Sequence, residues 1–162
     1  VETKKFMDAL KNNGSYTISE DMKSGLDKFY GNFATEQETI DKINKLYSDT
    51  GYLIDTHTAV GAAVYDKYVA ETGDKTVTAI ASTASPFKFV RTVMDAIHDE
   101  KDDRSATDSA EYELSLCDIM SDETGIPLPK PIEELKKALI HHTTVCDPSD
   151  MTEVVKSFLK ID

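Results

Sequence analysis

One short segment, residues 76–81, constrains the fold of this chain more than any other. It reads TVTAIA, holds no charge and follows the helix-breaking pair Gly73 and Asp74. This composition is typical of a strand that is covered on both faces, as in a parallel sheet. The N–H and C=O groups of such a strand need ladder partners, and the only other candidate strand is a short one near residues 143–146. The sequence therefore predicts a portion of a larger α/β protein, whose sheet is mostly formed by polypeptide outside this chain.

Helical periodicity dominates the remaining sequence. Thr35 and Glu38 have the spacing of a capping box, which predicts the start of a helix. Ser85 is a natural N-cap before Pro86, a residue that the first helical turn tolerates well. We therefore expect a predominantly α-helical chain with one or two β-strands, its helices covering about residues 2–11, 20–30, 35–51, 56–72, 86–98, 106–120, 131–139 and 148–159.

The charge of the chain excludes two classes of partner. The sequence has 18 Lys and Arg against 30 Asp and Glu, for a formal net charge of -12. This negative charge repels the phosphates of a nucleic acid and the surface of an anionic membrane, and no local stripe of Lys or Arg offsets the repulsion. The longest apolar stretch, at about residues 59–65, is far shorter than the ~20 residues that span a bilayer. We expect neither nucleic acid nor membrane as a partner.

The passage from the expected strand into the next helix is the best candidate for a ligand site. In open α/β sheets, ligands bind beyond the carboxyl ends of strands, close to helix N-termini. Ser82, Thr83 and Ser85 could hold a ligand there, and a simple helix cap with solvated neighbours is the alternative. His57, near the start of the preceding helix, could serve as an acid–base group, although a histidine at a helix start is more often structural.

No metal site and no catalytic set is predicted. His141 and His142 lack a third ligand nearby, and the acidic run within residues 99–103 lacks the glycine and spacing of a calcium loop. Cys117 and Cys146 are the two cysteines of the sequence, and there is no second pair. This count favours reduced thiols in a cytoplasmic protein. No Ser/His/Asp or Cys/His set can be assembled.

Two blocks of sequence, YLIDTHTAV at residues 52–60 and STASPFKF at residues 82–89, resemble threonine synthase. The resemblance continues through NGSYTIS at residues 13–19 and HHTTVCDPSDMTEVVKSF at residues 141–158. It is a resemblance to the carboxyl-terminal third of such an enzyme. This agrees with the missing sheet, and with a chain that opens at Val1 in helical sequence, so we expect a fragment.

The resemblance implies an α/β parent enzyme of fold type II that uses pyridoxal phosphate and is cytoplasmic. Such an enzyme converts O-phosphohomoserine and water to threonine and phosphate. Residues 1–98 would then form the carboxyl-terminal part of the catalytic domain, residues 99–104 a charged linker, and residues 105–162 a helical extension. The lysine that carries the cofactor lies upstream in the family, so the expected partner is the N-terminal portion of the same enzyme and the isolated chain is expected to be inactive.

The resemblance also assigns site residues. The counterpart of Thr83 faces the pyridine nitrogen of the cofactor, and Ser82 is its neighbour in the cofactor-binding loop. His57, Thr58, Ser85 and Lys88 fall in the vicinity of the active site without assigned roles, and Lys88 is not the cofactor-bearing lysine. The alternative from another class is a self-contained, non-catalytic acidic helical interaction module.

Overall fold

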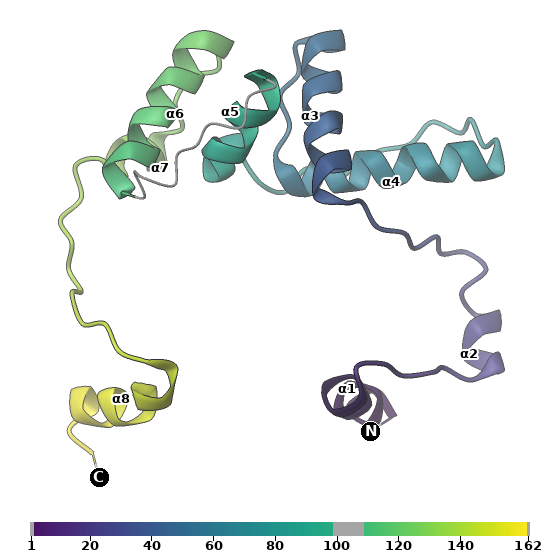
Figure 1. Ribbon diagram of the computed structural model, residues 1–162, viewed down its shortest axis with the longest axis horizontal. Helices are drawn as coiled ribbons and strands as arrows, with labels where there is room; N and C mark the ends of the chain where they lie inside the picture. The colour runs from purple at the N-terminus through teal and green to yellow at the C-terminus, as the bar shows by residue number, and fades with distance from the viewer. Residues whose placement is uncertain (1, 99–108, 162) are drawn as a thin grey trace.

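The computed structural model describes residues 2–98 and 109–161 and is mostly helical (Figure 1). The expectation of a predominantly α-helical chain is therefore confirmed. The expected linker at 99–104 and the start of the helix expected from 106 lie outside the described residues. The elements are α1 (Glu2–Asn13), α2 (Glu20–Ser24), α3 (Glu36–Thr50), α4 (Thr56–Thr72), the 3₁₀ turn η1 (Pro86–Phe89), α5 (Val90–His98), α6 (Ala110–Thr124), α7 (Lys130–Leu135), the 3₁₀ turn η3 (Pro148–Asp150) and α8 (Met151–Leu159).

Helices α3 and α4 begin and end where local signals place them. The Thr35 hydroxyl accepts a hydrogen bond from the Glu38 amide at 3.2 Å, and the Glu38 carboxylate accepts one from the Thr35 amide at 2.7 Å. The predicted capping box is thus confirmed. Gly51 and Gly73 end the two helices with φ of 71° and 70°, a left-handed conformation that favours glycine.

The carboxylate of Glu38 also links α3 to α4. Its ion pair with Lys67, at 2.7 Å, and the hydrogen bond from Thr35 lower the pKa of Glu38 from its ordinary value of 4.5 to about 2. Because the folded-state pKa is lowered, the stability that this carboxylate contributes is complete above pH 4.5 and is lost as the pH falls toward 2.

We expect Glu38→Gln to flatten the dependence of Tm on pH in this acid range, because glutamine keeps the cap acceptor but cannot pair with Lys67 as an anion. Circular dichroism melts between pH 6 and pH 2, roughly the window over which such a carboxylate titrates, measure this. Glu36→Gln, in the same helical turn, is the matched control. An unchanged acid profile in Glu38→Gln would contradict the prediction.

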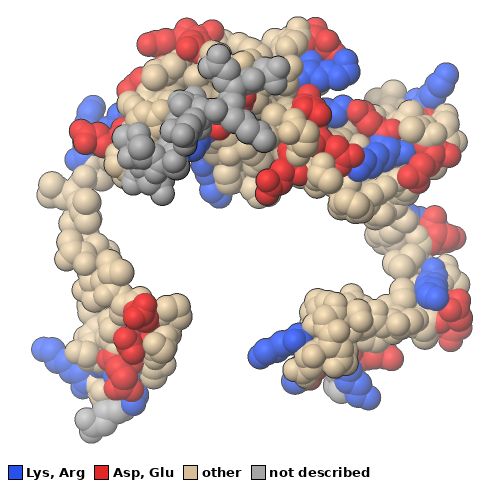
Figure 2. All heavy atoms as spheres, viewed as in Figure 1, with Lys and Arg blue, Asp and Glu red and all other residues tan. Residues whose placement is uncertain are grey.

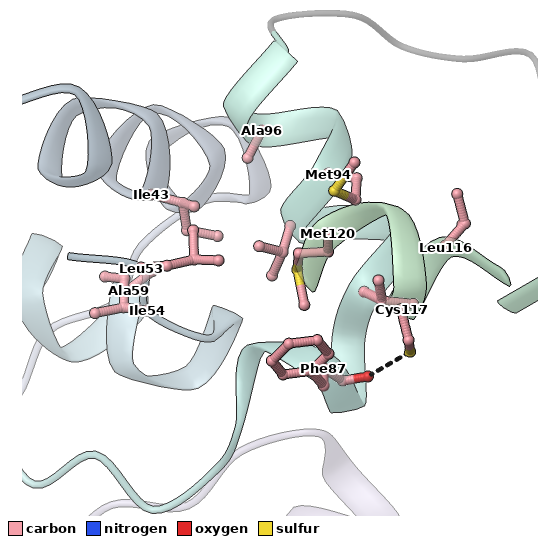
Figure 3. Close-up of a cluster of buried hydrophobic side chains, with 12 residues drawn as sticks. Ile43, Leu53, Ile54, Ala59, Phe87, Met94, Ala96, Leu116, Cys117 and Met120 are labelled. Atoms are coloured by element: carbon pink, nitrogen blue, oxygen red, sulfur yellow. Dashed lines mark hydrogen bonds between the residues drawn. The ribbon is translucent and has the colours of Figure 1, made fainter. Parts of the chain in front are cut away.

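The hydrophobic core lies where α3, α4, α5 and α6 meet (Figure 3). Ile43 of α3, Val93 of α5 and Met120 of α6 are each fully buried. Leu116 and Met120 follow the segment outside the described residues, so the chain on both sides of that segment contributes to one core. The other buried members of the cluster are Leu53, Ile54, Ala59, Phe87, Val90, Met94, Ala96 and Cys117.

The terminal helices stand apart from this core, with α1 and α2 toward one end of an open arc and α8 toward the other (Figure 1). The helix expected over 20–30 is wrong in extent, because α2 ends at Ser24. The helix expected over 131–139 likewise ends at Leu135. Phe29 is 75% exposed and Leu139 is 78% exposed, so the apolar faces that would have extended these helices have no surface to pack on.

No strand forms within residues 2–98 or 109–161, so the strands expected at 76–81 and near 143–146 are wrong for this structure. Both segments are extended but exposed, with Val77 at 98% and Val145 at 92% of their full accessibility. The physical reason is that neither segment has a ladder partner for its backbone N–H and C=O groups in the described part of the chain.

Acidic and basic side chains are interspersed over the face of the molecule that Figure 2 shows. Within the described ranges, none of the helices is long and apolar enough to cross a membrane.

Candidate functional site

The structure brings the first turn of α4 beside the loop that precedes η1. The extended segment after α4 turns back at Asp74, whose carboxylate accepts hydrogen bonds from the Tyr68 hydroxyl at 2.7 Å and the Thr76 amide at 2.9 Å. The segment then runs back along α4 (Figure 1), and a Cβ added to Gly61 would lie 3.6 Å from Cγ2 of Ile80. This return path carries Ser82 to the N-terminal end of α4.

Asp55 is the buried centre of this junction and the N-cap of α4. Its side chain is fully buried, and it accepts hydrogen bonds from the His57 amide at 2.9 Å, the Thr58 amide at 3.3 Å and the Thr58 hydroxyl. Nδ1 of His57 lies 3.2 Å from the carboxylate. Burial alone would raise the pKa of Asp55, but the hydrogen bonds from Thr58 and His57 outweigh it and hold the pKa below its ordinary value. Asp55 is therefore a buried carboxylate that stays ionised.

Thr58 connects Asp55 to the loop of the candidate site. Its side chain is buried, at 7% exposed, and its hydroxyl oxygen lies 3.0 Å from that of Ser82. This contact joins residues that are 24 apart in the sequence. Two of the residues expected near the active site, Thr58 and Ser82, are thus in direct contact.

Thr83 and Ser85 follow Ser82 along the loop. Thr83 is exposed, and its hydroxyl makes no hydrogen bond with any residue that the structure describes. Ser85 accepts a hydrogen bond from the Phe87 amide at 3.3 Å and so caps η1, as its place before Pro86 predicted. The loop is therefore fixed by Ser82 at one end and Ser85 at the other, and the Thr83 hydroxyl remains available to a ligand.

His57 and Lys88 both lie against the ring of Phe89. The His57 ring centroid is 4.8 Å from that of Phe89, and Nζ of Lys88 is 5.4 Å from the Phe89 centroid. The His57 side chain is 68% exposed, so its ring faces solvent on the side away from Asp55. A partly buried aromatic ring thus holds two basic side chains beside the loop.

Asp55 and Phe89 were not predicted as parts of the site. Asp55 carried a usable signal, because an aspartate directly before a helix is a strong N-cap candidate and its amide partners include that of His57. Phe89 carried none beyond its apolar character, since its contact with His57 joins residues 32 positions apart along the chain.

No group of three or more His, Cys, Asp or Glu side chains that could hold a metal occurs in the described ranges. His141 and His142 are exposed, with ring centroids 6.5 Å apart. The chemistry that the site offers is that of hydroxyls, one ionised carboxylate and basic side chains.

Comparison with known proteins identifies the family to which this site belongs. The profile of the family described as "Threonine synthase, C-terminal" matches residues 58–155. Threonine synthase of Schizosaccharomyces pombe is 32% identical over 142 residues, which cover 86% of this chain. Threonine synthase of Saccharomyces cerevisiae is 33% identical over 94 residues, which cover 54% of this chain. The chain belongs to the threonine synthase C-terminal family, and the resemblance noted in its sequence is confirmed.

The matches also define how much of these relatives the chain represents. The aligned residues span 27% of the Schizosaccharomyces pombe protein and 18% of the Saccharomyces cerevisiae protein. The match to a family of carboxyl-terminal regions agrees with the expectation of a carboxyl-terminal portion.

Proposed function

We propose that this chain is the carboxyl-terminal part of a threonine synthase, an enzyme that converts O-phosphohomoserine and water to threonine and phosphate. The family match supports this proposal most directly, since it extends over residues 58–155 and thus includes the loop with Thr83. A non-catalytic acidic helical module, the alternative considered for this sequence, is not favoured by the same match.

The residues of the loop fit the cofactor of this family, pyridoxal phosphate. When bound, the cofactor supplies an electron sink for bond breaking at the carbon atoms of an amino-acid substrate. Thr83 offers a neutral hydroxyl with no partner among the described residues, at a loop anchored by Ser82 and Ser85. A neutral hydroxyl can hydrogen-bond the pyridine nitrogen without the charge of a carboxylate, which would favour a protonated ring.

We assign the other candidate residues to the surroundings of the cofactor. Ser82 binds the cofactor next to Thr83, and His57, Thr58, Ser85 and Lys88 lie in the vicinity of the active site. Lys88, held at Phe89 beside the loop, contributes a positive charge that favours an anionic substrate there.

The proposal includes an intramolecular partner and a cell compartment. We propose that the N-terminal portion of a cytoplasmic enzyme of fold type II supplies the cofactor-bearing lysine and the strands that pair with residues 76–81. The exposed, extended backbone of that segment supports this, because it offers unpaired ladder groups to an adjoining strand.

The test compares the complete protein with the chain of residues 1–162. We expect the complete protein to bind pyridoxal phosphate, seen by its visible absorbance, and to release phosphate from O-phosphohomoserine, whereas residues 1–162 alone do neither. Thr83→Val in the complete protein should lower kcat by roughly 10-fold or more, because a hydrogen bond to the reacting ring system is lost.

Thr78→Val is the matched control, since Thr78 is exposed on the same extended segment and a β-branched replacement suits a strand. It should leave kcat unchanged. A complete protein that binds no pyridoxal phosphate and releases no phosphate would refute the proposed function, and equal effects of the two substitutions would refute the role of Thr83.

A further inference from the structure

A chain of hydrogen bonds leads from the buried core of the site to its exposed loop. It starts at the fully buried carboxylate of Asp55, passes through the buried hydroxyl of Thr58 and ends at the hydroxyl of Ser82. We call these three residues the relay. Ser82 directly precedes Thr83, so the last member of the relay adjoins the hydroxyl assigned to the cofactor.

The direction of these bonds follows from counting protons. A hydroxyl has one proton to donate, and an ionised carboxylate has none. The Thr58 proton therefore goes to Asp55, which leaves the Thr58 oxygen as the acceptor for the proton of Ser82. Each bond in the relay points toward the buried charge, and a hydrogen bond that ends on an ionised acceptor is stronger than one between neutral groups.

Capping of α4 does not explain the relay. Asp55 already caps α4 by accepting hydrogen bonds from the backbone amides of His57 and Thr58, and neither of these two bonds requires the Thr58 hydroxyl. Other threonines in these helices, such as Thr39 and Thr72, bond back to a carbonyl of their own helix or its N-cap residue, at 2.8 Å in both cases. The hydroxyl of Thr58 instead reaches a different segment of the chain.

We propose that Asp55 and Thr58 are positioning residues that fix the Ser82–Thr83 loop in the conformation that receives the cofactor ring. This inference rests on the proposed function and extends it to residues that do not themselves touch the cofactor. The rigid part is the first turn of α4, which is buried at Asp55, Thr58 and Ala59, and the positioned part is the exposed loop. Without the relay, the loop keeps its cap at Ser85 but loses its attachment at Ser82.

The first measurement needs no activity and no cofactor. In the complete protein without pyridoxal phosphate, hydrogen–deuterium exchange of the peptide over residues 80–86 should be faster in Thr58→Val than in the unmodified protein. Thr58→Ser restores the hydroxyl and should restore slow exchange. Thr39→Val is the matched control, because Thr39 is also a buried threonine, 8% exposed, in the first turn of a helix, and it should leave exchange over 80–86 unchanged.

The second measurement is the affinity for pyridoxal phosphate, obtained by fluorescence titration of the same variants. Thr58→Val should weaken binding by about 3- to 10-fold, which corresponds to the net value of one hydrogen bond. Ser82→Ala cuts the relay at its exposed end, where the fold does not depend on it, and should reproduce both effects even if Thr58→Val fails to fold.

The outcomes separate the relay from the proposed function. Unchanged exchange over 80–86 in Ser82→Ala and in folded Thr58→Val would overturn the relay, whatever the enzyme does. Faster exchange with unchanged affinity would overturn the positioning of the cofactor. If the unmodified complete protein binds no pyridoxal phosphate, the proposed function fails, and positioning of the cofactor fails with it.

Discussion

Replacing Phe87 with alanine is expected to lower the free energy of unfolding of this chain by about 3–5 kcal/mol, the usual range for removing a buried aromatic side chain. Phe87 is only 4% exposed and belongs to the hydrophobic core (Figure 3). Its carbonyl also faces the Cys117 thiol, with Sγ 3.7 Å from the oxygen, so α6 packs directly over this turn. Alanine would leave a cavity between η1 and α6 that rigid helices close only in part.

Urea unfolding followed by circular dichroism measures this loss. Phe29→Ala is the matched control, because Phe29 is 75% exposed, and its removal should change the free energy of unfolding by less than about 0.5 kcal/mol. A loss below about 1 kcal/mol for Phe87→Ala would mean that the core around η1 does not contribute to the cooperative fold.

Asp55→Ala is expected to lower the free energy of unfolding by about 1.5–5 kcal/mol, the sum of two effects. Loss of an N-cap carboxylate commonly costs about 0.5–2 kcal/mol. The Thr58 hydroxyl would in addition lose its buried acceptor, at about 1–3 kcal/mol for an unsatisfied polar group. The second effect arises because Asp55 is fully buried, so water cannot replace the lost bonds.

Ser109→Ala provides the comparison for this second prediction. Ser109 caps α6 through the Tyr112 amide at 3.2 Å, but it is exposed, so its loss should show the capping effect alone. Urea unfolding of both variants gives the difference between them. Equal losses would show that burial adds nothing at Asp55, and would remove the energetic basis of a structured junction at the start of α4.

The strand at 76–81 illustrates where sequence reasoning about this chain failed. Its composition is typical of a strand, but the structure gives an exposed segment without regular secondary structure. A strand, however, exists only when a second segment accepts and donates the ladder hydrogen bonds, and composition carries no information on whether that segment is present. The same applies to the truncated α2 and α7, since short helices depend on packing surfaces that their own residues do not provide.

Local chemistry, by contrast, was readable from the sequence alone. The capping box at Thr35 and Glu38, the cap at Ser85 and the glycine ends of α3 and α4 all act over a few residues, so nearby residues suffice to predict them. The family was also readable, because the blocks at 52–60 and 82–89 are characteristic even without a structure. Only the tertiary structure decided that Asp55, Thr58 and Ser82 form one relay, since their contact joins segments 24 residues apart and depends on the path by which the chain returns along α4.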